Sequence, residues 1–308
     1  MAKALIPILA LIFVGVLINK IRFASKDTIA GMKSIASNVF LPVVIFNALA
    51  TASFSRDTIF IFCITMFVLL AGFGIGFGTK KLYNKEYVDY IPFVTVTFEG
   101  GMLGYALAEV LFGKDGLYHI ATIDLAGAVF SFTLWITMIE RLQGRTTEGV
   151  KRKSLIKSML TTPTLIAAIA GLICGLSGMG NMLVNSQAGD VYNSIVDMFS
   201  APLTPIILIS LGYGMNISGE NIKDAIAIII QRIIVVGVTF LAAFLVFGRF
   251  VTFTRELTLS MILYFTLPPS FLLSVYVKGE KSQNVISCVL SLYIIITLAV
   301  FCVLLCTK

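Results

Sequence analysis

The sequence Val94-Thr-Val-Thr-Phe-Glu-Gly-Gly-Met-Leu-Gly104 lies in the middle of one long apolar stretch, and Leu263-Tyr-Phe-Thr-Leu-Pro-Pro-Ser270 lies in another. The first places the carboxyl group of Glu99 and a glycine pair in apolar surroundings. Paired glycines favour unwinding of a helix, and each proline in a helix interior removes an amide donor at a cost of about 3 kcal/mol. Both stretches are therefore predicted to be helices that break near their middle, at Gly100-Gly101 and at Pro268-Pro269.

The rest of the chain has the composition of a protein embedded in a lipid bilayer. Its 308 residues are 58% hydrophobic and 13% charged, with a mean hydropathy of +0.97, whereas soluble domains are about 25% charged. A spanning helix needs roughly 20 mainly apolar residues, so this length leaves room for about ten spans. The apolar runs between charged connectors predict spans at 4–19, 35–53, 58–79, 89–112, 116–139, 162–177, 194–215, 224–247, 257–277 and 284–306.

Basic residues gather on one side of these spans. Of the 23 lysines and arginines, 17 fall on the side of the connector between spans five and six, with Lys33 and Arg232 counted among them. By the positive-inside rule that side is cytoplasmic, which places both termini on the extracytoplasmic side of a cell membrane. The net charge of +7 is thereby explained by orientation in the membrane, and no nucleic-acid partner is predicted.

The two halves of the chain share a pattern of prolines and glycines. Pro7 precedes Gly15 by eight residues in span one, Pro163 precedes Gly171 by eight in span six, and a proline also interrupts the second span of each half. Because each half has an odd number of spans, its second copy enters the membrane in the opposite direction, and two inverted copies can expose a central site to either side in turn. The predicted domains are a first five-helix repeat at 1–140, a basic cytoplasmic connector at 141–160 and a second, inverted five-helix repeat at 161–308.

The two predicted breaks occupy matching positions, in spans four and nine. Backbone groups freed at a break cannot face lipid, so a break persists only where it lines a polar cavity or is buried against protein. Half-helices that end there present amides suited to anions and carbonyls suited to cations. We therefore expect the two breaks to form one binding site; the alternative for each is a plain kink.

Four stretches, in order along nearly the whole chain, resemble motifs of the auxin efflux carrier family, which includes plant PIN-type carriers and bacterial organic-anion permeases. These stretches are Leu41-Pro-Val-Val-Ile-Phe-Asn-Ala-Leu-Ala50, Gly101-Met-Leu-Gly-Tyr-Ala-Leu107, Ala201-Pro-Leu leading to Leu211-Gly212, and Leu267-Pro-Pro-Ser270. The chain is thus similar to a PIN-like bacterial permease of the bile acid/auxin transporter superfamily. The resemblance implies an all-α membrane protein with ten helices in two inverted repeats, crossing broken helices four and nine, elevator-like movement of the crossover domain, and a scaffold that often dimerises.

The chain departs from this family pattern at Glu99, where members usually carry asparagine, and at Ala106, where they usually carry proline. A charge inside a span costs roughly 2.5–3.5 kcal/mol, so it needs a partner. Glu99 is expected to be a proton or Na⁺ site, or an anchor for a cationic group of the solute; the alternative is a neutral, hydrogen-bonding carboxyl group. The family alignment places Asp124 and Ser131 of span five near the pocket, and the alternatives for Asp124 are a structural hydrogen-bond partner or an interfacial charge.

The residues expected to bind the solute are Asn47, Glu99, Gly100, Gly101, Met102, Asp124, Ser131, Thr266, Pro268 and Pro269. Glu99 and Asp124 are the expected ion-coupling pair. The alternative for Asn47 is a hydrogen bond between helices. The five cysteines and the single histidine have no metal-ligand spacing, so no metal and no cofactor other than a coupling H⁺ or Na⁺ is predicted.

Together these features predict a secondary active transporter of a small organic solute, a carboxylate or related metabolite, with an elevator-type alternating-access mechanism and a site at the crossover. One alternative is a transporter of an amino acid or cationic solute anchored by Glu99; another is a membrane sensor that binds a ligand in the same pocket without moving it. The sequence has no nucleotide-binding motif that would supply ATP energy. It also lacks paired intramembrane catalytic groups, so no enzyme is predicted. Expected partners are the solute, the lipid bilayer and, from the resemblance, a second copy in a homodimer.

Overall fold

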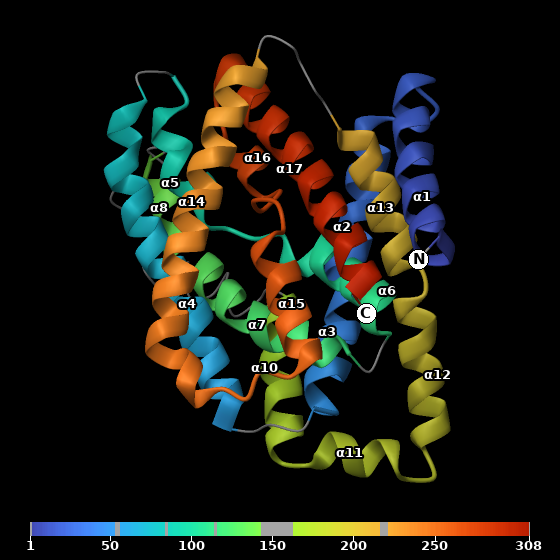
Figure 1. The fold of residues 1–308 in the computed structure, drawn as a ribbon. Coiled ribbons are helices and arrows are strands. Elements are labelled where there is room, and N and C mark those ends of the chain that lie inside the picture. Colours follow the sequence, from blue (N-terminus) through green and yellow to red (C-terminus); the bar gives the residue numbers. More distant parts are fainter. Residues whose placement is uncertain are drawn as a thin grey trace.

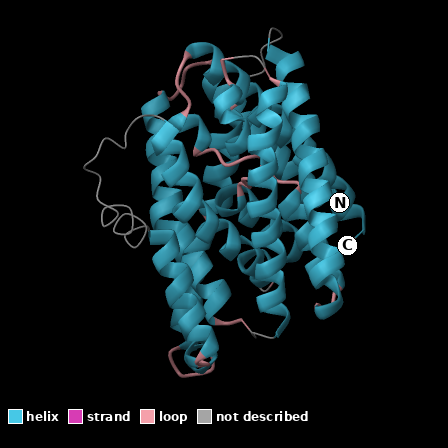
Figure 2. Ribbon diagram, turned by 90° about the vertical axis from the view of Figure 1, so that its left-hand side faces the viewer, coloured by secondary structure: helices cyan, strands magenta, loops and turns pink. Residues whose placement is uncertain are grey.

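The computed structural model is a bundle of helices. It describes residues 2–52, 56–83, 86–113, 116–142, 163–215 and 221–307, and these ranges contain no strand. Figure 2 shows loop segments at both ends of the bundle and also in its middle. The all-α class is therefore confirmed for the described part of the chain. Most of the predicted connector at 141–160, from residue 143 onward, lies outside the described residues.

The first half of the chain contains eight α-helices within its described residues, and short helical turns join several of them. The α-helices are α1 (Ala2–Lys20), α2 (Lys26–Ile35), α3 (Leu41–Ala50), α4 (Arg56–Thr79), α5 (Ile91–Thr95), α6 (Tyr105–Phe112), α7 (Leu117–Phe130) and α8 (Ile136–Leu142). The π-helical turns are η1 (Ala36–Phe40), η4 (Gly100–Gly104) and η5 (Ser131–Trp135), and the 3₁₀ turns are η2 (Lys80–Leu82) and η3 (Val88–Tyr90).

The second half, from residue 163, is organised similarly, with one further short helix, α11, that none of the predicted spans includes. Its helices are α10 (Pro163–Leu176), α11 (Met179–Val184), α12 (Gly189–Ser200), α13 (Leu203–Gly214), α14 (Ile222–Phe247), α15 (Arg255–Phe265), α16 (Leu273–Tyr276) and α17 (Glu280–Thr307), with the 3₁₀ turn η7 (Gly248–Phe250) after α14.

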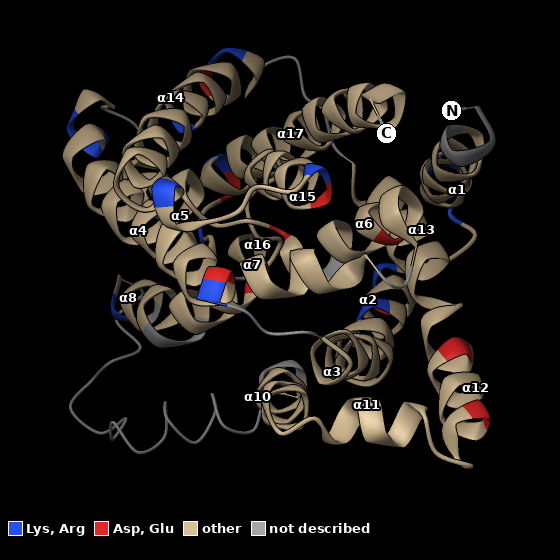
Figure 3. Ribbon diagram, turned by 60° about the horizontal axis from the view of Figure 1, so that its bottom comes forward, with Lys and Arg blue, Asp and Glu red and all other residues tan. Residues whose placement is uncertain are grey.

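Five helical stretches of the described chain are long and apolar enough to cross a bilayer. They are Lys26–Ala50, Arg56–Leu82, Gly189–Gly214, Ile222–Phe250 and Glu280–Thr307, and shorter apolar helices run over Ile6–Lys20, Leu117–Phe130 and Ile166–Leu176. Figure 3 shows that charged residues occupy few positions along these ribbons. This is the pattern of a multi-pass membrane protein; the count of ten spans in inverted repeats stays a prediction.

Span two begins nine residues before its predicted start at residue 35. The helix runs from Lys26 to Ala50 without interruption, and the side chain of Ser25 caps its start by accepting a hydrogen bond from the Thr28 amide. Hydropathy missed this segment because its first turns are polar. The π-helical turn η1 ends just before Pro42, where proline lacks an amide donor and its ring obstructs the preceding turn. As a result Lys33, which was counted as a connector charge, lies inside a spanning helix.

The helices form two groups. The first helix group contains α1–α3 and α10–α13, in which α1 packs on α13 and α3 packs on α10. The second helix group contains α4–α8 and α14–α17, in which α4 packs on α14 and α7, and α14 also packs on α5 and α17. In Figure 1, α4, α8 and α14 of the second group stand opposite α1, α12 and α13 of the first. The two groups contact each other at fewer places than the helices within each group do: α7 contacts α3, and η4 and α6 contact α13.

Glycines permit the two main helix contacts of the first group. A β-carbon at Gly15 of α1 would collide with the carbonyl oxygen of Ile209 in α13, and one at Gly171 of α10 would lie 2.8 Å from the carbonyl oxygen of Phe46 in α3. Small residues let helix backbones approach closely in membranes, where van der Waals packing drives association. The glycines that follow Pro7 and Pro163 in sequence thus mark two helix contacts of the same kind.

Candidate functional site

The interruptions of spans four and nine lie against each other. Span four is non-helical at 96–99, between α5 and η4, and span nine is non-helical at 266–272, between α15 and α16. We call these two segments the crossover. The amide of Glu99 donates a hydrogen bond to the carbonyl of Pro268 at 2.9 Å, so each break satisfies backbone groups freed by the other. Span four is interrupted just before the predicted glycine pair, since the π-helical turn begins at Gly100.

The Glu99 side chain faces the second break. It is 7% exposed, and its Oε2 accepts a hydrogen bond from the amide of Phe271 at 2.6 Å. Beside it, the amide of Ser270 donates to the hydroxyl of Thr97 at 3.2 Å. The Phe271 bond thus fixes one oxygen of the Glu99 carboxyl group against the second break.

A buried arginine joins the two breaks from the other side. Arg232 of α14 is 0% exposed, and its guanidinium donates to the carbonyls of Val94 at 2.6 Å, Thr97 at 2.6 Å and Leu267 at 3.1 Å. These carbonyls lie at the ends of α5 and α15, where unpaired carbonyls and the helix dipole concentrate negative charge. The guanidinium carbon also lies 4.7 Å from the ring centroid of Phe98, a favourable cation–π distance.

Counting Arg232 among the connector charges is therefore wrong. It lies ten residues after the start of α14, or about 15 Å along the helix, which is half of a hydrocarbon core of roughly 30 Å. In the described part of the chain, the ion pairs within 4.0 Å do not include this guanidinium. Its partners are backbone carbonyls, which are an accepted way to hold a charge inside a membrane.

A cavity of about 380 Å³ opens beside the crossover, between the two helix groups. The first group lines it with Lys33, Ser37 and Leu41, and the second group lines it with residues of the crossover, η4 and α7, among them Glu99 and Asp124. Ligand pockets are typically ~300–1,000 Å³, so this cavity fits a small solute. Its ionisable lining is one ammonium group on one helix group and two carboxyl groups on the other.

Asp124 of α7 is held against the crossover. The hydroxyl of Tyr264 in α15 donates to its Oδ1 at 3.0 Å. Two glycines make room for this pair, because a β-carbon at Gly100 would collide with the Asp124 carboxyl group and one at Gly127 would collide with the Tyr264 hydroxyl. The glycine at position 100 is therefore required by a side chain from another helix, in addition to any effect on unwinding.

The structure brings most of the predicted solute-binding residues together. Glu99, Gly101, Asp124 and Ser131 line the cavity. Gly100, Pro268 and Pro269 are buried next to this lining, in or beside the crossover. The side chain of Met102 lies outside the described residues.

Asn47 and Thr266 do not line the cavity. The Oδ1 of Asn47 accepts a hydrogen bond from the hydroxyl of Tyr192 in α12 at 2.8 Å, and the hydroxyl of Thr266 donates to the Ile262 carbonyl of its own helix at 2.8 Å. Asn47 follows Leu41 by six residues, which turns it roughly 240° around the helix from the cavity face at 3.6 residues per turn. For Asn47 the structure thus favours the alternative, a hydrogen bond between helices.

The sequence reasoning missed Lys33, Ser37 and Phe271 as cavity residues. A signal for two of them was present, because Lys33, Ser37 and Leu41 are spaced four apart and so share one face of a helix. Phe271 had no such signal, since its position depends on how the two breaks cross. Within the described ranges, no group of three or more His, Cys, Asp or Glu residues could hold a metal ion.

Comparison with known proteins gives the family. Residues 1–305 match the family described as Membrane transport protein. The chain is also similar to an uncharacterized transporter of Methanocaldococcus jannaschii, with 24% identity over 216 residues that cover 68% of this chain and 67% of the relative. The match spans the breaks, the cavity and both helix groups. The chain therefore belongs to this membrane transport protein family, the auxin efflux carrier family that its sequence motifs resemble.

Proposed function

We propose that this protein is a secondary active transporter that carries a small organic solute bearing a carboxylate, bound at the crossover of spans four and nine. The second helix group moves relative to the first as an elevator and exposes the site to each side of the membrane in turn. The observation that carries the proposal is the cavity itself, because it lies between the two helix groups and holds ionisable side chains at a pair of broken helices. A homodimer built on the first helix group belongs to the same proposal.

The packing supports movement of one group against the other. The second group is internally bonded at the crossover, where Glu99, Pro268 and Arg232 connect spans four, eight and nine. A unit tied in this way can move without breaking those bonds. By contrast, its interface with the first group is limited to a few helix contacts around the cavity.

The pattern of helix contacts supports two inverted repeats. If span one corresponds to span six and span two to span seven, the contact of α1 with α13 corresponds to that of α10 with α3, and these are the two main contacts of the first group. Both contacts depend on a glycine, Gly15 in one and Gly171 in the other. The same correspondence pairs the contact of α4 with α7 and that of α14 with α17.

Glu99 and Asp124 give the site its coupling chemistry in this proposal. Two carboxyl groups in a cavity of this size favour a cation between them. That cation is a proton, Na⁺ or a cationic group of the solute itself. Its binding compensates the charge that would otherwise cross the apolar core at a cost of roughly 2.5–3.5 kcal/mol.

Counterflow in liposomes tests the transporter function. Purified protein is reconstituted and loaded with unlabelled mono- and dicarboxylates, amino acids and amines in turn, and entry of the labelled solute is followed with and without imposed H⁺, Na⁺ or voltage gradients. We expect at least one carboxylate-bearing solute to exchange. Tight binding of a solute with no exchange under any gradient would refute transport and support a ligand sensor.

Glu99→Gln tests the role of the carboxyl group. The glutamine oxygen can still accept the hydrogen bond from the Phe271 amide, so the fold should persist while the charge is lost. We expect transport to fall at least tenfold, as is typical for losing a buried charge partner worth about 2–5 kcal/mol. Glu256→Gln is the control, because Glu256 pairs with His119 at 3.6 Å within the second helix group and does not line the cavity. Equal transport by both variants would remove Glu99 from the mechanism.

A further inference from the structure

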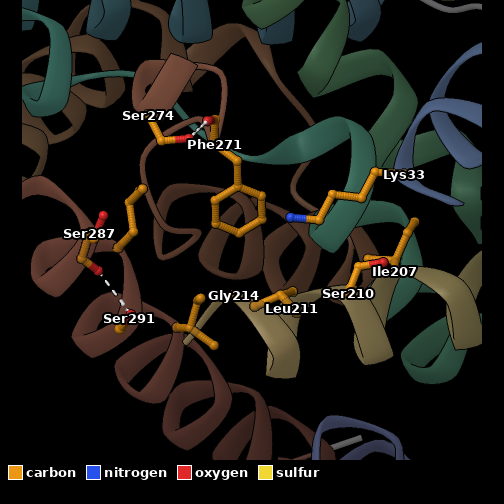
Figure 4. A pocket seen from close by; sticks show the side chains of 11 residues that line it. Lys33, Ile207, Ser210, Leu211, Gly214, Phe271, Ser274, Ser287 and Ser291 are labelled. Atoms are coloured by element: carbon orange, nitrogen blue, oxygen red, sulfur yellow. Dashed lines mark hydrogen bonds between the residues drawn. The ribbon is translucent and has the colours of Figure 1, made fainter. Parts of the chain in front are cut away.

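Lys33 lies where two cavities meet. Besides the crossover cavity, it lines a second cavity of about 170 Å³, and the two share Phe271 and Ser274. We call the second one the serine cavity, because Ser210, Ser274, Ser287 and Ser291 line it. Figure 4 shows the Lys33 side chain reaching toward the ring of Phe271 within this cavity. A solute in either cavity is therefore within reach of the same ammonium group.

The serine cavity has a hydroxyl group without a partner. Ser210 of α13 is 1% exposed, and its Oγ has no hydrogen-bond partner. A buried hydroxyl group left unpaired costs about 1–3 kcal/mol. Because Ser210 lines a cavity, a ligand bound there would supply the missing hydrogen-bond partner. A carboxylate placed beside Lys33 and Ser210 would accept one charge-assisted and one neutral hydrogen bond.

The charges of the two cavities are separated in space. Lys33 supplies an ammonium group from the first helix group, and Glu99 and Asp124 supply carboxyl groups from the second. Lys33 and Glu99 thus face the same cavity from the two helix groups. The cavity between them therefore suits a solute with a negative group at its Lys33 end and a positive group at its Glu99 end.

We propose that the solute is a zwitterion of the amino-acid type, whose carboxylate binds Lys33 and Ser210 and whose ammonium group binds Glu99 and Asp124. The inference rests on the proposed transport function and specifies the chemical class that the same site selects. The ammonium group of the solute then lies beside the two carboxyl groups that line the crossover cavity. The carboxylate of the solute accepts the hydrogen bond that the Ser210 hydroxyl otherwise lacks.

Simpler solutes match only part of this arrangement. A dicarboxylate would bring its second negative charge against Glu99 and Asp124, and like charges in contact at a desolvated site are strongly unfavourable. A monocarboxylate would leave both carboxyl groups without the ammonium partner. An amine would leave Lys33 and Ser210 without the carboxylate.

Matched solutes test the inference in the reconstituted full chain. One set is leucine, 4-methylpentanoate, which lacks the amino group, and 3-methylbutylamine, which lacks the carboxylate; a second set is alanine, propionate and ethylamine, and succinate represents dicarboxylates. Each is offered as a competitor and as the labelled solute in counterflow. We expect at least one amino acid to exchange at least tenfold faster than its own acid and amine, and faster than succinate.

Substitutions test which end of the solute lies beside Lys33 and Ser210. Lys33→Met should remove the advantage of the amino acid over its amine, Lys33→Arg should restore much of it, and Ser210→Ala should weaken amino-acid binding severalfold. Lys20→Met is the control, because Lys20 is an exposed lysine of the same helix group, at the end of α1, and lines neither cavity. Elution as a single species in size-exclusion chromatography shows that each variant is folded.

The outcomes are distinct. Faster exchange of an amino acid that depends on Lys33 supports the inference. Exchange of succinate or propionate in preference to every amino acid, or an unchanged preference in folded Lys33→Met, overturns the inference but leaves the transporter function intact. Exchange of no solute at all overturns the proposed transport function and the inference with it.

Discussion

Removal of the Arg232 guanidinium should loosen the crossover, and this is the sharpest test of how the two broken helices are held. Arg232→Ala deletes the donors to the carbonyls of Val94, Thr97 and Leu267. It leaves three buried carbonyl groups beside the breaks of spans four and nine without their charged donor. The perturbation thus acts on the crossover and leaves the cavity lining itself unchanged in composition.

The size of the effect follows from these three bonds. A hydrogen bond to a charged group contributes about 1.5–3 kcal/mol, which puts an upper bound of roughly 9 kcal/mol on the loss. The loss is smaller in practice, because the variant no longer buries a charge, and burying one costs several kcal/mol. We expect the free energy of unfolding to fall by about 3–5 kcal/mol, because three buried carbonyls at about 1–3 kcal/mol each lose their donor and the relief from burying a charge offsets part of that cost.

Unfolding in mixed micelles of rising denaturing-detergent content measures this change, and chemical rescue makes it specific. Guanidinium or methylguanidinium ions at millimolar concentration should enter the space left in Arg232→Ala and restore both stability and counterflow. Arg249→Ala is the control, because Arg249 packs over the ring of Phe250 at 4.8 Å but lies in the turn after α14. Its loss should cost no more than about 1 kcal/mol.

Two results would refute the reasoning about Arg232. One is a stability of Arg232→Ala within about 1 kcal/mol of the original protein, the level expected of an exposed position. The other is equal rescue by guanidinium and by sodium chloride of the same ionic strength. Either would mean that the carbonyls find water or other partners without cost, and that the guanidinium does not hold the breaks together.

Two further substitutions probe the packing around the site. Gly100→Ala would push a β-carbon into the Asp124 carboxyl group and should cost about 1–3 kcal/mol of stability together with most of the transport. The control is Gly74→Ala, whose β-carbon meets no atom within 4 Å and which should be neutral. Equal counterflow and equal unfolding of the two variants would show that Asp124 can move away freely. Asn47→Ala should cost about 0.5–1.5 kcal/mol of stability, because it loses the Tyr192 hydrogen bond, and the KM for the transported solute should not change. A raised KM at unchanged stability would show instead that Asn47 binds the solute.

The sequence was informative about the crossover because its signals are local. A glycine pair, a proline pair and a carboxyl group in the middle of apolar stretches each change helix stability at their own position, so the breaks and Glu99 could be read from the chain. Asp124 came from the family alignment, and the structure places it at the same cavity. What it bonds to, the hydroxyl of Tyr264, depends on how α7 and α15 pack.

Lys33 and Arg232 show where local reasoning ends. Both were counted as connector charges, because a charge in or near an apolar run usually marks its end. Lys33 lies within a span whose first turns are polar, and Arg232 is tolerated because carbonyls from two distant segments converge on it. For Asn47 the sequence left two roles open, because the identity of a polar residue does not fix the direction in which its helix turns it, and the side chain bonds Tyr192 of another helix.

Arg232 and Glu99 lie on the second helix group and Lys33 lies on the first, and this distribution affects whether the protein can change conformation without a bound solute. In the proposed motion the second group carries Arg232 together with its three carbonyl partners, so the environment of that charge is the same at both ends of the movement. Glu99 also travels with the second group, but Lys33 stays behind on the first. An ionised Glu99 then crosses the apolar core away from the Lys33 ammonium group, and a charge inside a span costs roughly 2.5–3.5 kcal/mol. The ammonium group of a bound zwitterion pairs with Glu99, but the solute's own carboxylate leaves Lys33 and adds an equal negative charge, so a cation such as H⁺ or Na⁺ must travel with the solute; crossing with both bound is then less costly than crossing empty, which is the condition for exchange to outpace leak.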